Sequence, residues 1–408
     1  MVEPVHLLIL HQNFVDHRHP GGTRHLELAK NLVEMGHRVT VVTGTLDYLT
    51  GKPIEGPRRE RISGVEVVRS YAFPSLHYSL IWRVVSYVSF MLTSIWSAIR
   101  IREVDVVLGT TPPLFQLPSA WLVARLKRRP FVLEVRDLWP EFAIDMGVLT
   151  NPIIIFSARR AEQFFYRRAD HFVVNSPAYR EYLVGKGVPL KTISVIPNGV
   201  DIRMFDPDSR GQQIRDELGL GDDFVVTYAG AMGPANDIET ILDAAMRFDR
   251  AAHVRFVLVG GGRDAISLER KARARGLDHV VFAGTYPKDR MRCVLAASNA
   301  CVATLMNIPM FKTTYPNKVF DYMAAGRPTI LGIDGVIRDV IEQSEGGLFV
   351  TPGDSEALAQ AIETMRSDPD LAQRMGRSAR RYVEEHFDRR LQSTELEKVL
   401  KLVAPKAA

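Results

Sequence analysis

A lysine and an aspartate, Lys318 and Asp321, stand about one helical turn apart in a segment whose ends are clearly marked. Pro316 and Asn317 predict a helix start, and Gly326 predicts its end. Lys318 then lies in the first turn, where a cation is unfavourable against the helix dipole unless an anion lies in front of it. A lysine for phosphate charge and a carboxylate for ribose hydroxyls would together bind a nucleoside diphosphate. The alternative is a surface ion pair between positions i and i+3.

Two glycine-containing turns could bring backbone N–H groups close to a phosphate. Gly21 and Gly22 precede a predicted helix, an arrangement that can hold an anion at the helix N-terminus. A plain strand-to-helix turn is the alternative. The string Gly260-Gly261-Gly262-Arg263-Asp264-Ala265 matches the dinucleotide-binding pattern. No carboxylate ends the next predicted strand to hold a ribose, so NAD binding is not favoured.

Short β-rich runs alternate with helical patterns, which predicts an α/β protein with two doubly wound parallel sheets. The predicted strands of the first half are residues 6–10, 38–43, 65–70, 104–109, 131–135, 171–175 and 193–196. Those of the second half are residues 224–228, 255–259, 280–283, 300–304, 329–331 and 347–350. The stretch 198–221 predicts the joint between two Rossmann-like domains. The expected ligand site is a deep cleft at the carboxyl ends of the strands.

The composition is that of a globular protein, with 46% hydrophobic and 24% charged residues in a chain of 408. Two cysteines, Cys293 and Cys301, and no Cys/His cluster of zinc spacing favour a reducing cytosol. Residues 1–200 carry 24 Lys+Arg against 17 Asp+Glu, which predicts an anionic partner for this half. Nucleic acid is not favoured, because interleaved aromatic and basic residues are missing. The N-terminus lacks a basic region, so no signal peptide is expected.

Several strings, in this order along nearly the whole chain, resemble the retaining family 4 glycosyltransferases of the GT-B fold. They are Gly21-Gly22 with Leu28-Ala29, residues 36–41, residues 136–141, residues 196–201, residues 228–230, residues 259–262 and residues 321–328. The strings at 136–141 and 316–318 look like the branch that builds O-antigen and capsule, including N-acetylfucosamine-type sugar transferases. The resemblance implies an acceptor-binding domain at 1–200, a donor-binding domain at 201–386, and a C-terminal helix at about 387–408 that crosses back to the first domain.

The resemblance also implies a binding site for a UDP-sugar donor. Its expected residues are Gly21, Gly22, Gly230, Gly233, Gly262, Tyr286, Asn317, Lys318 and Asp321. Gly22 would lie against the diphosphate, the loop 285–287 near the uracil, and Asp321 on the ribose. The chain departs from the family pattern in two places, since Thr313 replaces the first glutamate of a Glu-x₇-Glu pattern and Ala231-Met232-Gly233-Pro234 replaces the usual arginine and lysine. Lys318 is therefore the cation expected to hold the diphosphate.

Arg136, Asp137 and Glu141 follow a predicted strand and are the expected catalytic residues. Many relatives have a histidine that contacts the sugar where Arg136 stands. Arginine cannot accept a proton, so Arg136 would position or neutralise an anion and leave Asp137 or Glu141 as base or sugar-hydroxyl ligand. The alternative is that Asp137 caps the following turn.

Transfer in the family is thought to need no protein nucleophile, because the leaving diphosphate helps to take the acceptor proton. No cofactor or metal is therefore expected. Two strings, Asp206-Pro207-Asp208 and Asp368-Pro369-Asp370, have the D-x-D look of metal-dependent transferases of another fold. Both contain proline, and we expect them to form turns.

Residues 78–99 are apolar except for Arg83 and scattered hydroxyl side chains, which predicts an amphipathic helix and not a membrane span. Val85, Leu92, Trp96 and Ile99 follow the predicted core-facing stripe. The opposite face and nearby basic residues are expected to rest on an anionic membrane. The membrane-facing set is Trp82, Arg83, Tyr87, Phe90, Arg100, Arg102, Arg125, Arg128 and Arg129. An ordinary buried helix with solvated arginines is the alternative.

The sequence thus predicts a retaining transferase that moves a sugar, N-acetylated in the branch it resembles, from a UDP-sugar to a lipid-linked or saccharide acceptor. We expect it at the cytoplasmic face of the cell membrane, as a peripheral protein of cell-surface polysaccharide assembly. One alternative is a non-hydrolysing UDP-sugar epimerase of the same fold. Another is an inactive nucleotide-sugar-binding scaffold, which the departures at Thr313 and Ala231 allow.

Overall fold

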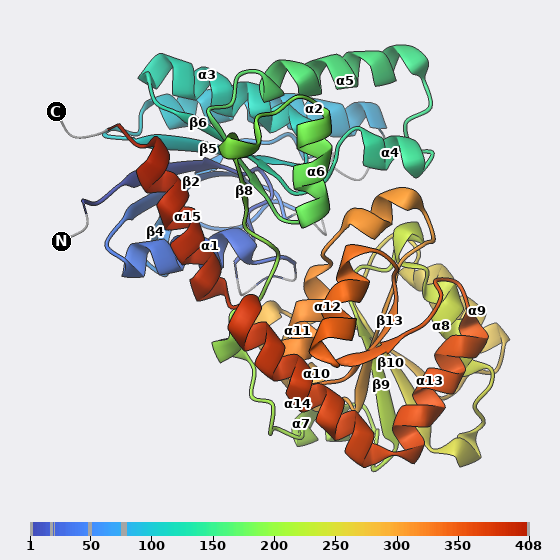
Figure 1. The fold of residues 1–408 in the computed structure, drawn as a ribbon. Helices are drawn as coiled ribbons and strands as arrows, with labels where there is room; N and C mark the ends of the chain where they lie inside the picture. The colour runs from blue at the N-terminus through green and yellow to red at the C-terminus, as the bar shows by residue number, and fades with distance from the viewer. Residues whose placement is uncertain (1–2, 17–18, 20, 48–50, 75–79, 406–408) are drawn as a thin grey trace. The chain divides into compact units, whose positions relative to one another are not determined.

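The computed structural model describes residues 3–16, 19, 21–47, 51–74 and 80–405 of the chain (Figure 1). These residues form two compact units. The first comprises Met1–Asp16, Thr23–Pro197 and Arg389–Ala408, and the second comprises His17–Gly22 and Asn198–Asp388. The chain therefore leaves the first unit at Pro197 and returns to it at Arg389.

The first unit is built on an eight-stranded sheet, counted over its described residues, in the order β3-β4-β2-β1-β5-β6-β7-β8. All neighbouring strands are parallel except the pair β3 and β4. The strands are β1 (His6–Leu10), β2 (Arg38–Gly44), β3 (Arg59–Ile62), β4 (Val65–Ser70), β5 (Val106–Thr111), β6 (Phe131–Val135), β7 (His171–Val174) and β8 (Ile193–Val195). The helices are α1 (Arg24–Glu34), α2 (Leu80–Ile99), α3 (Leu117–Lys127), α4 (Glu141–Asp145), α5 (Pro152–Tyr166), α6 (Pro177–Gly185) and α15 (Arg389–Val403).

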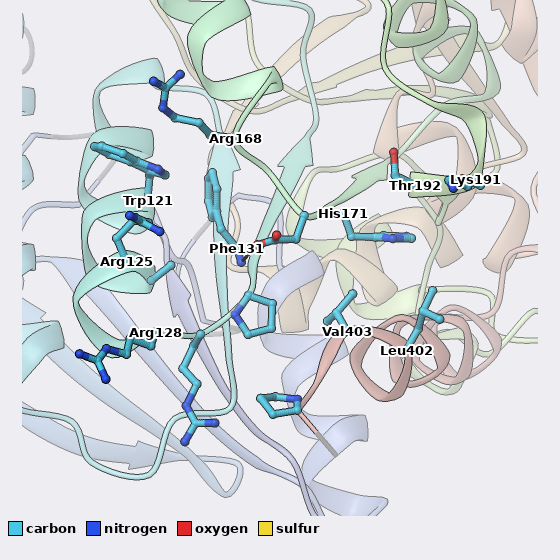
Figure 2. A pocket seen from close by; sticks show the side chains of 15 residues that line it. Trp121, Arg125, Arg128, Phe131, Arg168, His171, Lys191, Thr192, Leu402 and Val403 are labelled. Atoms are coloured by element: carbon cyan, nitrogen blue, oxygen red, sulfur yellow. Dashed lines mark hydrogen bonds between the residues drawn. The ribbon is translucent and has the colours of Figure 1, made fainter. Parts of the chain in front are cut away.

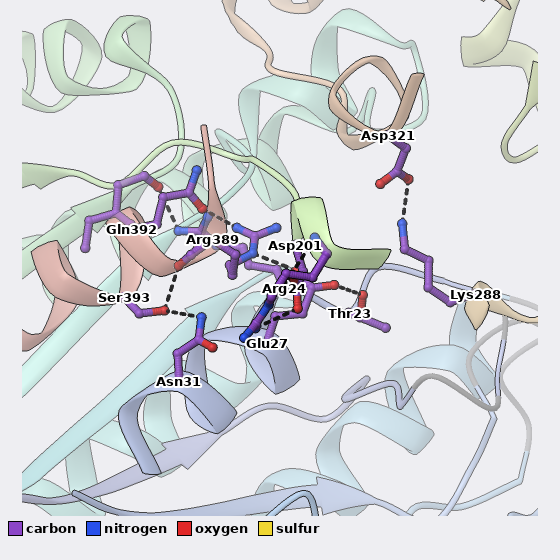
Figure 3. A network of polar contacts seen from close by, with 12 residues as sticks. Thr23, Arg24, Glu27, Asn31, Asp201, Lys288, Asp321, Arg389, Gln392 and Ser393 are labelled. Atoms are coloured by element: carbon purple, nitrogen blue, oxygen red, sulfur yellow. Dashed lines mark hydrogen bonds and ion pairs between the residues drawn. The ribbon is translucent and has the colours of Figure 1, made fainter. Parts of the chain in front are cut away.

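Helices cover both faces of the first sheet, as right-handed crossovers on either side of β1 require. Helix α1 joins β1 to β2, whereas α2, α3 and α5 lead to β5, β6 and β7 on the other side of β1. Figure 1 shows α1 and α15 together on one face, and α2, α3 and α5 on the other. Polar contacts join α15 to α1: Arg389 donates to Glu27 over 2.7 Å, and Asn31 donates to Ser393 over 3.0 Å (Figure 3).

The second unit is built on an all-parallel sheet, six-stranded in its described residues, in the order β11-β10-β9-β12-β13-β14. Its strands are β9 (Phe224–Ala229), β10 (Val254–Val259), β11 (Val280–Gly284), β12 (Ala300–Thr304), β13 (Thr329–Gly332) and β14 (Gly347–Phe349). Its helices are α7 (Gln212–Glu217), α8 (Ile238–Ala245), α9 (Ala265–Ala274), α10 (Met291–Ala296), α11 (Asn317–Ala324), α12 (Val336–Ser344), α13 (Ser355–Ser367) and α14 (Pro369–His386). The buried strands and the apolar sides of these helices form the core.

Two features of the fold differ from the sequence prediction. Strand β3 was not predicted, because this exposed edge strand of polar and charged residues has no apolar run. It pairs with β4 through a tight turn in which Ser63 and Gly64 both have positive φ, as a two-residue hairpin requires. The predicted joint at 198–221 begins where the chain leaves the first unit, and it contains helix α7, which was not predicted.

Helix α2 is rotated relative to the predicted orientation. Phe90, predicted to face a membrane, is fully buried and packs with Leu46 and Ala72. The predicted core stripe is instead exposed at Val85, Leu92, Trp96 and Ile99. Serines and an alanine occupy the buried side, and they are Ser86, Ser94 and Ala98. Small residues let a helix approach its neighbours closely, and serine hydroxyls can bond the carbonyls of their own helix, as Ser94 does with Met91.

None of the helices in the described ranges combines the length and the apolarity that a membrane-spanning helix needs.

Candidate functional site

Each sheet has one point at which the strand order reverses, and in open α/β sheets ligands bind at the carboxyl ends of the strands there. In the first unit this point lies between β1 and β5, and in the second between β9 and β12. The predicted catalytic residues follow β6, the strand next to β5. Most of the predicted donor residues follow the strands β9, β10 and β11 or lie in α11, whereas Gly21 and Gly22 precede α1. The two half-sites are described separately, one for each unit.

In the first unit, Arg136 is held at the carboxyl ends of the strands by three groups. Its Nε donates to Thr110 Oγ1 over 2.9 Å and to the carbonyl of Thr111 over 3.1 Å. Its Nη2 lies 3.2 Å from Nε2 of His11, which directly follows β1. Arginine can only donate, so Nε2 of His11 accepts and the proton of this imidazole sits on Nδ1. Burial, His25 and Arg136 hold the pKa of His11 well below its usual value, which keeps the ring neutral.

A buried charge network lies beneath Arg136, and the sequence analysis did not predict it. Glu134 in β6 accepts from Arg24 Nε over 3.0 Å and from His25 Nε2 over 2.5 Å. Arg24 also donates to the carbonyls of Ile196 and Pro197, over 2.7 and 2.6 Å. The carboxylate is therefore paired on both of its oxygens.

The ionisation of this network follows from its burial and its pairing. Burial alone would raise the pKa of Glu134, but the nearby His25 and Arg24 outweigh it and hold that pKa well below the usual value. Burial lowers the pKa of Arg24 to about 10, so it stays charged at neutral pH. Burial also lowers the pKa of His25, despite the opposing effect of Glu134. Within the described part of the chain, Nδ1 of His11 and Nδ1 of His25 are buried and have no hydrogen-bond partner.

Asp137 and Glu141, the two candidate carboxylates, differ in their surroundings. Burial raises the pKa of Asp137 to about 6, although the Arg136 charge opposes the shift. Glu141 forms a bidentate pair with Arg159, over 2.8 and 2.9 Å, on the side facing α5. The hydrogen bonds from Arg159 lower the pKa of Glu141 despite partial burial. Asp137 is thus the stronger base of the two, and Glu141 is committed to an ion pair.

In the second unit, Lys318 lies in the first turn of α11, as predicted. Its Nζ donates to Tyr228 Oη over 2.8 Å and to Asn236 Oδ1 over 2.9 Å. Burial lowers the pKa of Lys318 to about 7. No carboxylate lies within 4 Å of this Nζ among the residues that the structure describes. A lysine at the positive end of a helix, paired only with neutral groups, is prepared to take an anion.

Asp321 lies on the same helix and pairs with Lys288 over 2.5 Å (Figure 3). Lys288 begins the short helix η6 (Lys288–Arg290), directly after the loop predicted to lie near the uracil. Asp321 therefore pairs with Lys288 and not with Lys318, as the alternative of an i,i+3 ion pair would require. Tyr286 is buried, and its hydroxyl donates to Glu217 over 2.9 Å. Its hydroxyl is thus engaged with Glu217, the last residue of α7.

The predicted donor-site glycines differ in what surrounds them. A Cβ at Gly230 would lie 3.0 Å from Oη of Tyr228 and 3.1 and 3.2 Å from Cε and Nζ of Lys318, so a side chain there would crowd both side chains. A Cβ at Gly262 would meet the carbonyl oxygen of Met232 at 2.5 Å, so this glycine permits two loops to pack closely. At Gly233 a Cβ would meet nothing within 4 Å.

Gly21, Gly22 and Asn317 complete the predicted donor set. Gly21 has a φ of +140°, which only glycine adopts readily. A Cβ on Gly22 would lie 3.7 Å from Nδ2 of Asn317, and both residues belong to the second unit. Asn317 is exposed at the start of α11. The first N–H groups of a helix have no partner within the helix, so together with an amide side chain they suit an anionic group.

The string Asp206-Pro207-Asp208 forms a turn, as predicted, whereas Asp368-Pro369-Asp370 begins helix α14 instead of forming a turn. Asp206 accepts from the N–H of Asp208 over 3.1 Å, and Asp368 caps α14 by accepting from Leu371 over 2.9 Å. In the described ranges no three His, Cys, Asp or Glu side chains come together as metal ligands. The string Gly260 to Ala265 leads into α9. Gly260 and Gly262 leave room for the backbone of Gly230 and Met232, which a Cβ at either position would meet.

Comparison with known proteins identifies both halves of the chain. Residues 21–199 match the family described as the glycosyl transferase 4-like domain, and residues 223–368 match the glycosyl transferases group 1. Together the two matches cover well over half of the chain.

Individual relatives agree with these matches. The chain is 24% identical over 378 residues to the inferred colanic acid biosynthesis glycosyl transferase WcaI of Escherichia coli strain K12, over 89% of this chain and 91% of the relative. It is 27% identical over 231 residues to O-antigen chain mannosyltransferase C of Escherichia coli, over 55% of this chain and 59% of the relative.

A solved structure shares the fold over nearly the full length. The crystal structure of Anabaena HepE in complex with UDP and glucose superposes with a TM-score of 0.74 at 20% identity, over 97% of this chain and 99% of that one. The parallel sheets of the two units are the Rossmann-like domains of the GT-B architecture. The chain therefore belongs to the glycosyltransferases of the GT-B fold, with a glycosyl transferase 4-like domain followed by a group 1 domain.

Proposed function

We propose that the protein is a retaining glycosyltransferase that moves a sugar, N-acetylated in the branch it resembles, from a UDP-sugar to a lipid-linked or saccharide acceptor. The bound UDP and glucose of HepE support a UDP-sugar donor. The names of the two relatives, one of colanic acid biosynthesis and one of O-antigen chains, support a role in cell-surface polysaccharide assembly.

The observation that carries the proposal is the position of Lys318. It lies at the start of α11, beside Gly230 at the end of β9, where the second sheet reverses its strand order. Within the described ranges its ammonium group is paired with neutral atoms, Oη of Tyr228 and Oδ1 of Asn236. Lys318 and the helix N-terminus would hold the diphosphate, while Asp321 would accept from the ribose hydroxyls.

The chemistry of the proposed step is mainly electrostatic. The bond between the sugar C1 and the diphosphate oxygen breaks, and a bond from C1 to the acceptor oxygen forms on the same face. The acceptor proton passes to the leaving diphosphate, whose developing charge Lys318 stabilises. No metal is assigned a role, and full activity in excess chelator is the expected result. In the first unit, Arg136 would neutralise an anionic group of the reactants, and Asp137 would accept from a sugar or acceptor hydroxyl.

We also propose that the protein acts at the cytoplasmic face of the cell membrane. Cys293 and Cys301 are free thiols, which fits a reducing compartment. The rotated α2 exposes apolar side chains, with Trp82 at 48% and Trp96 at 63% exposure. Arg100 stacks on Trp96 at 3.8 Å, as expected for a helix at a headgroup layer.

Other members of the predicted membrane-facing set keep their place in this proposal, with two exceptions. Arg83, Arg102, Arg125 and Arg128 are exposed, and Arg129 is partly exposed. Tyr87 is half-buried and stacks on Phe115, and Phe90 is buried. The surface proposed to touch lipid is therefore Trp82, Val85, Leu92, Trp96 and Ile99 with these arginines. Salt-sensitive binding to anionic vesicles, absent with neutral ones, is the expected result; equal binding to both would contradict it.

Donor binding is tested with a pair of glycine substitutions. Calorimetric titration with UDP-, GDP- and dTDP-sugars should show binding of a UDP-sugar. Gly230→Ala should weaken it several-fold, because the new methyl group crowds Nζ of Lys318 and Oη of Tyr228. Gly233→Ala, with open space around its Cβ, is the matched control and should bind normally. Equal affinities for the two variants would overturn the placement of the diphosphate.

Turnover separates the proposal from its alternatives. A transferase incubated with UDP-sugar alone hydrolyses it slowly at most, whereas an epimerase changes the sugar. An inactive scaffold would show no dependence on Asp137 or Lys318, so Asp137→Ala and Lys318→Ala would leave any apparent turnover unchanged.

A further inference from the structure

A basic pocket lies at the amino ends of the strands in the first unit, outside the half-site described above (Figure 2). Its volume is about 950 Å³. Phe131 and His171, the first residues of β6 and β7, form its floor, and the ends of α3 and α15 form part of its walls. The pocket is within the size range of small-molecule sites, although it is open to solvent.

The pocket is separated from the proposed catalytic residues by the length of a strand. Phe131 begins β6, and Arg136 and Asp137 follow its last residue, Val135. The four-residue rise along β6 places the two ends about 13 Å apart. A ligand in the pocket therefore does not touch the carboxyl-end half-site of this unit.

Five cationic side chains line the pocket: Arg125, Arg128, Arg129, Arg168 and Lys191. In the described ranges none of them has a carboxylate within 4 Å. Asp170, the acidic residue of the lining, already accepts from the N–H of Phe131 over 2.7 Å. His171 is bonded to Ser194, and burial lowers its pKa, so it adds no charge at neutral pH.

Some of these cations are held in place by neighbouring rings and backbone. The guanidinium of Arg168 lies 3.4 Å from the ring centre of Phe164 and 5.7 Å from that of Trp121. Arg128 is the residue after α3 and has a φ of +54°. The chain turns there, and the next residue, Arg129, also lines the pocket. Leu402 and Val403 of α15 supply apolar lining on another side (Figure 2).

Five like charges around one hollow repel one another and concentrate a positive potential inside it. Arginine groups suit phosphate because their planar forks can donate two parallel hydrogen bonds. We propose that this pocket binds a phosphate-bearing ligand, with its anionic groups at the cations of the two walls, Arg125 and Arg128 on one side and Lys191 on the other (Figure 2), and its apolar part against Leu402 and Val403. The phosphate can come from a lipid headgroup or from a soluble molecule. This site is independent of glycosyl transfer.

The test compares two triple variants with equal loss of charge. Arg125→Gln/Arg128→Gln/Lys191→Gln removes cations from the pocket. Arg374→Gln/Arg377→Gln/Arg381→Gln removes three exposed arginines of α14 in the second unit and is the matched control. All six side chains are exposed, so both variants should fold, which circular dichroism and thermal unfolding check.

Each variant is titrated with inorganic pyrophosphate and, separately, with vesicles containing phosphatidylglycerol or only phosphatidylcholine. Pyrophosphate that enters the donor half-site binds both variants alike, so only the difference between them counts. A pyrophosphate affinity at least tenfold weaker in the pocket variant supports the site with a soluble ligand. A loss confined to phosphatidylglycerol vesicles supports it with a lipid headgroup when Arg83→Gln/Arg102→Gln, on the proposed membrane surface outside the pocket, keeps its vesicle binding; an equal loss in that variant contradicts a separate lipid site. If the pocket variant matches the control in both titrations, the proposal is wrong.

Discussion

Nη2 of Arg136 lies 3.2 Å from Nε2 of His11, although the two residues are 125 positions apart in the chain. The contact fixes the neutral ring of His11 with its proton on Nδ1, and it fixes the direction of the guanidinium. Because His11 follows β1 and Arg136 follows β6, the two meet only when the strands on either side of β5 are in register.

His11→Leu should lower kcat/KM about 10- to 100-fold and stability by about 1–3 kcal/mol, since Arg136 loses a buried acceptor. His11→Gln, which keeps an acceptor oxygen, should recover part of both. Denaturant unfolding and sugar-transfer kinetics measure the two effects. The exposed residue His386, changed to leucine, is the control. Full activity in His11→Leu would show that this contact does not position Arg136.

Glu134→Gln should destabilise the first unit by about 3–5 kcal/mol, because it leaves the buried charge of Arg24 without its partner. Glu395→Gln, at an exposed ion pair, should cost at most about 1 kcal/mol. The native pKa of Glu134 is depressed, so its stabilising effect is present above the unfolded pKa and is lost as pH falls through the native one.

The wild-type protein should therefore lose more stability than Glu134→Gln when unfolding is compared at neutral and acid pH. Equal losses in the two proteins would show that the network is not ionised as described.

Asp137→Asn should lower kcat/KM at least about 100-fold if the carboxylate accepts a hydrogen bond or proton during transfer. In the wild-type enzyme kcat/KM should fall as pH decreases through about 6, the raised pKa of Asp137. The kcat/KM of the variant should not fall in this pH range. Asp145→Asn, an exposed carboxylate in α4, is the control. A variant with the wild-type pH profile would exclude Asp137 from the reaction.

The raised pKa of Asp137 also has a consequence for stability. The folded state holds the proton more tightly, so wild-type stability should fall as pH rises from about 4 to about 6, by at most about 3 kcal/mol. Asp137→Asn should lack this contribution and gain in relative stability at pH 7.5. Unfolding of both proteins at pH 4 and pH 7.5 measures the difference.

Lys318→Met should weaken UDP-sugar binding about 10- to 100-fold by removing a charge-assisted hydrogen bond. Because the pKa of Lys318 is about 7 and a diphosphate binds the charged form, wild-type affinity should decrease as pH rises from 7 to 9. The affinity can decrease by at most about tenfold for each pH unit. Binding should also take up protons, which calorimetry in buffers of different ionisation enthalpy detects.

The Lys318→Met variant should show no such pH dependence. Lys398→Met, which removes an exposed lysine of α15, should bind like wild type. A wild-type affinity that is constant between pH 7 and 9 would contradict the role of Lys318.

The second sheet was predictable because each of its strands is a short apolar run bounded by helical patterns. Every strand from β9 to β14 lies within one residue of its predicted ends, and α11 begins at the predicted Asn317. Helix α2 was predicted in extent but not in rotation, since periodicity cannot tell an apolar stripe that faces a core from one that faces solvent. Half-buried serines of α2 bond to other elements, as Ser97 does with Ser70 and Ser89 with the N–H of Phe73, and nothing in the sequence names these partners.

The buried network was not predicted, because its members are separated by more than 100 residues. A lone histidine such as His25 is usual in a core, and the residues near it in the sequence do not indicate its partner. One signal was available: Glu134 stands inside an otherwise apolar strand, where a carboxylate requires a buried cation. The arginine and histidine at the start of α1 were candidates for that partner.

Backbone hydrogen exchange with and without UDP tests the donor half-site most directly. The expected result is slower exchange at Gly230 and Ala231, at the first turn of α11 around Lys318, and at residues 285–288. Unchanged exchange at all three places, with slowing elsewhere in the chain, would contradict the assignment of the nucleotide to the second unit.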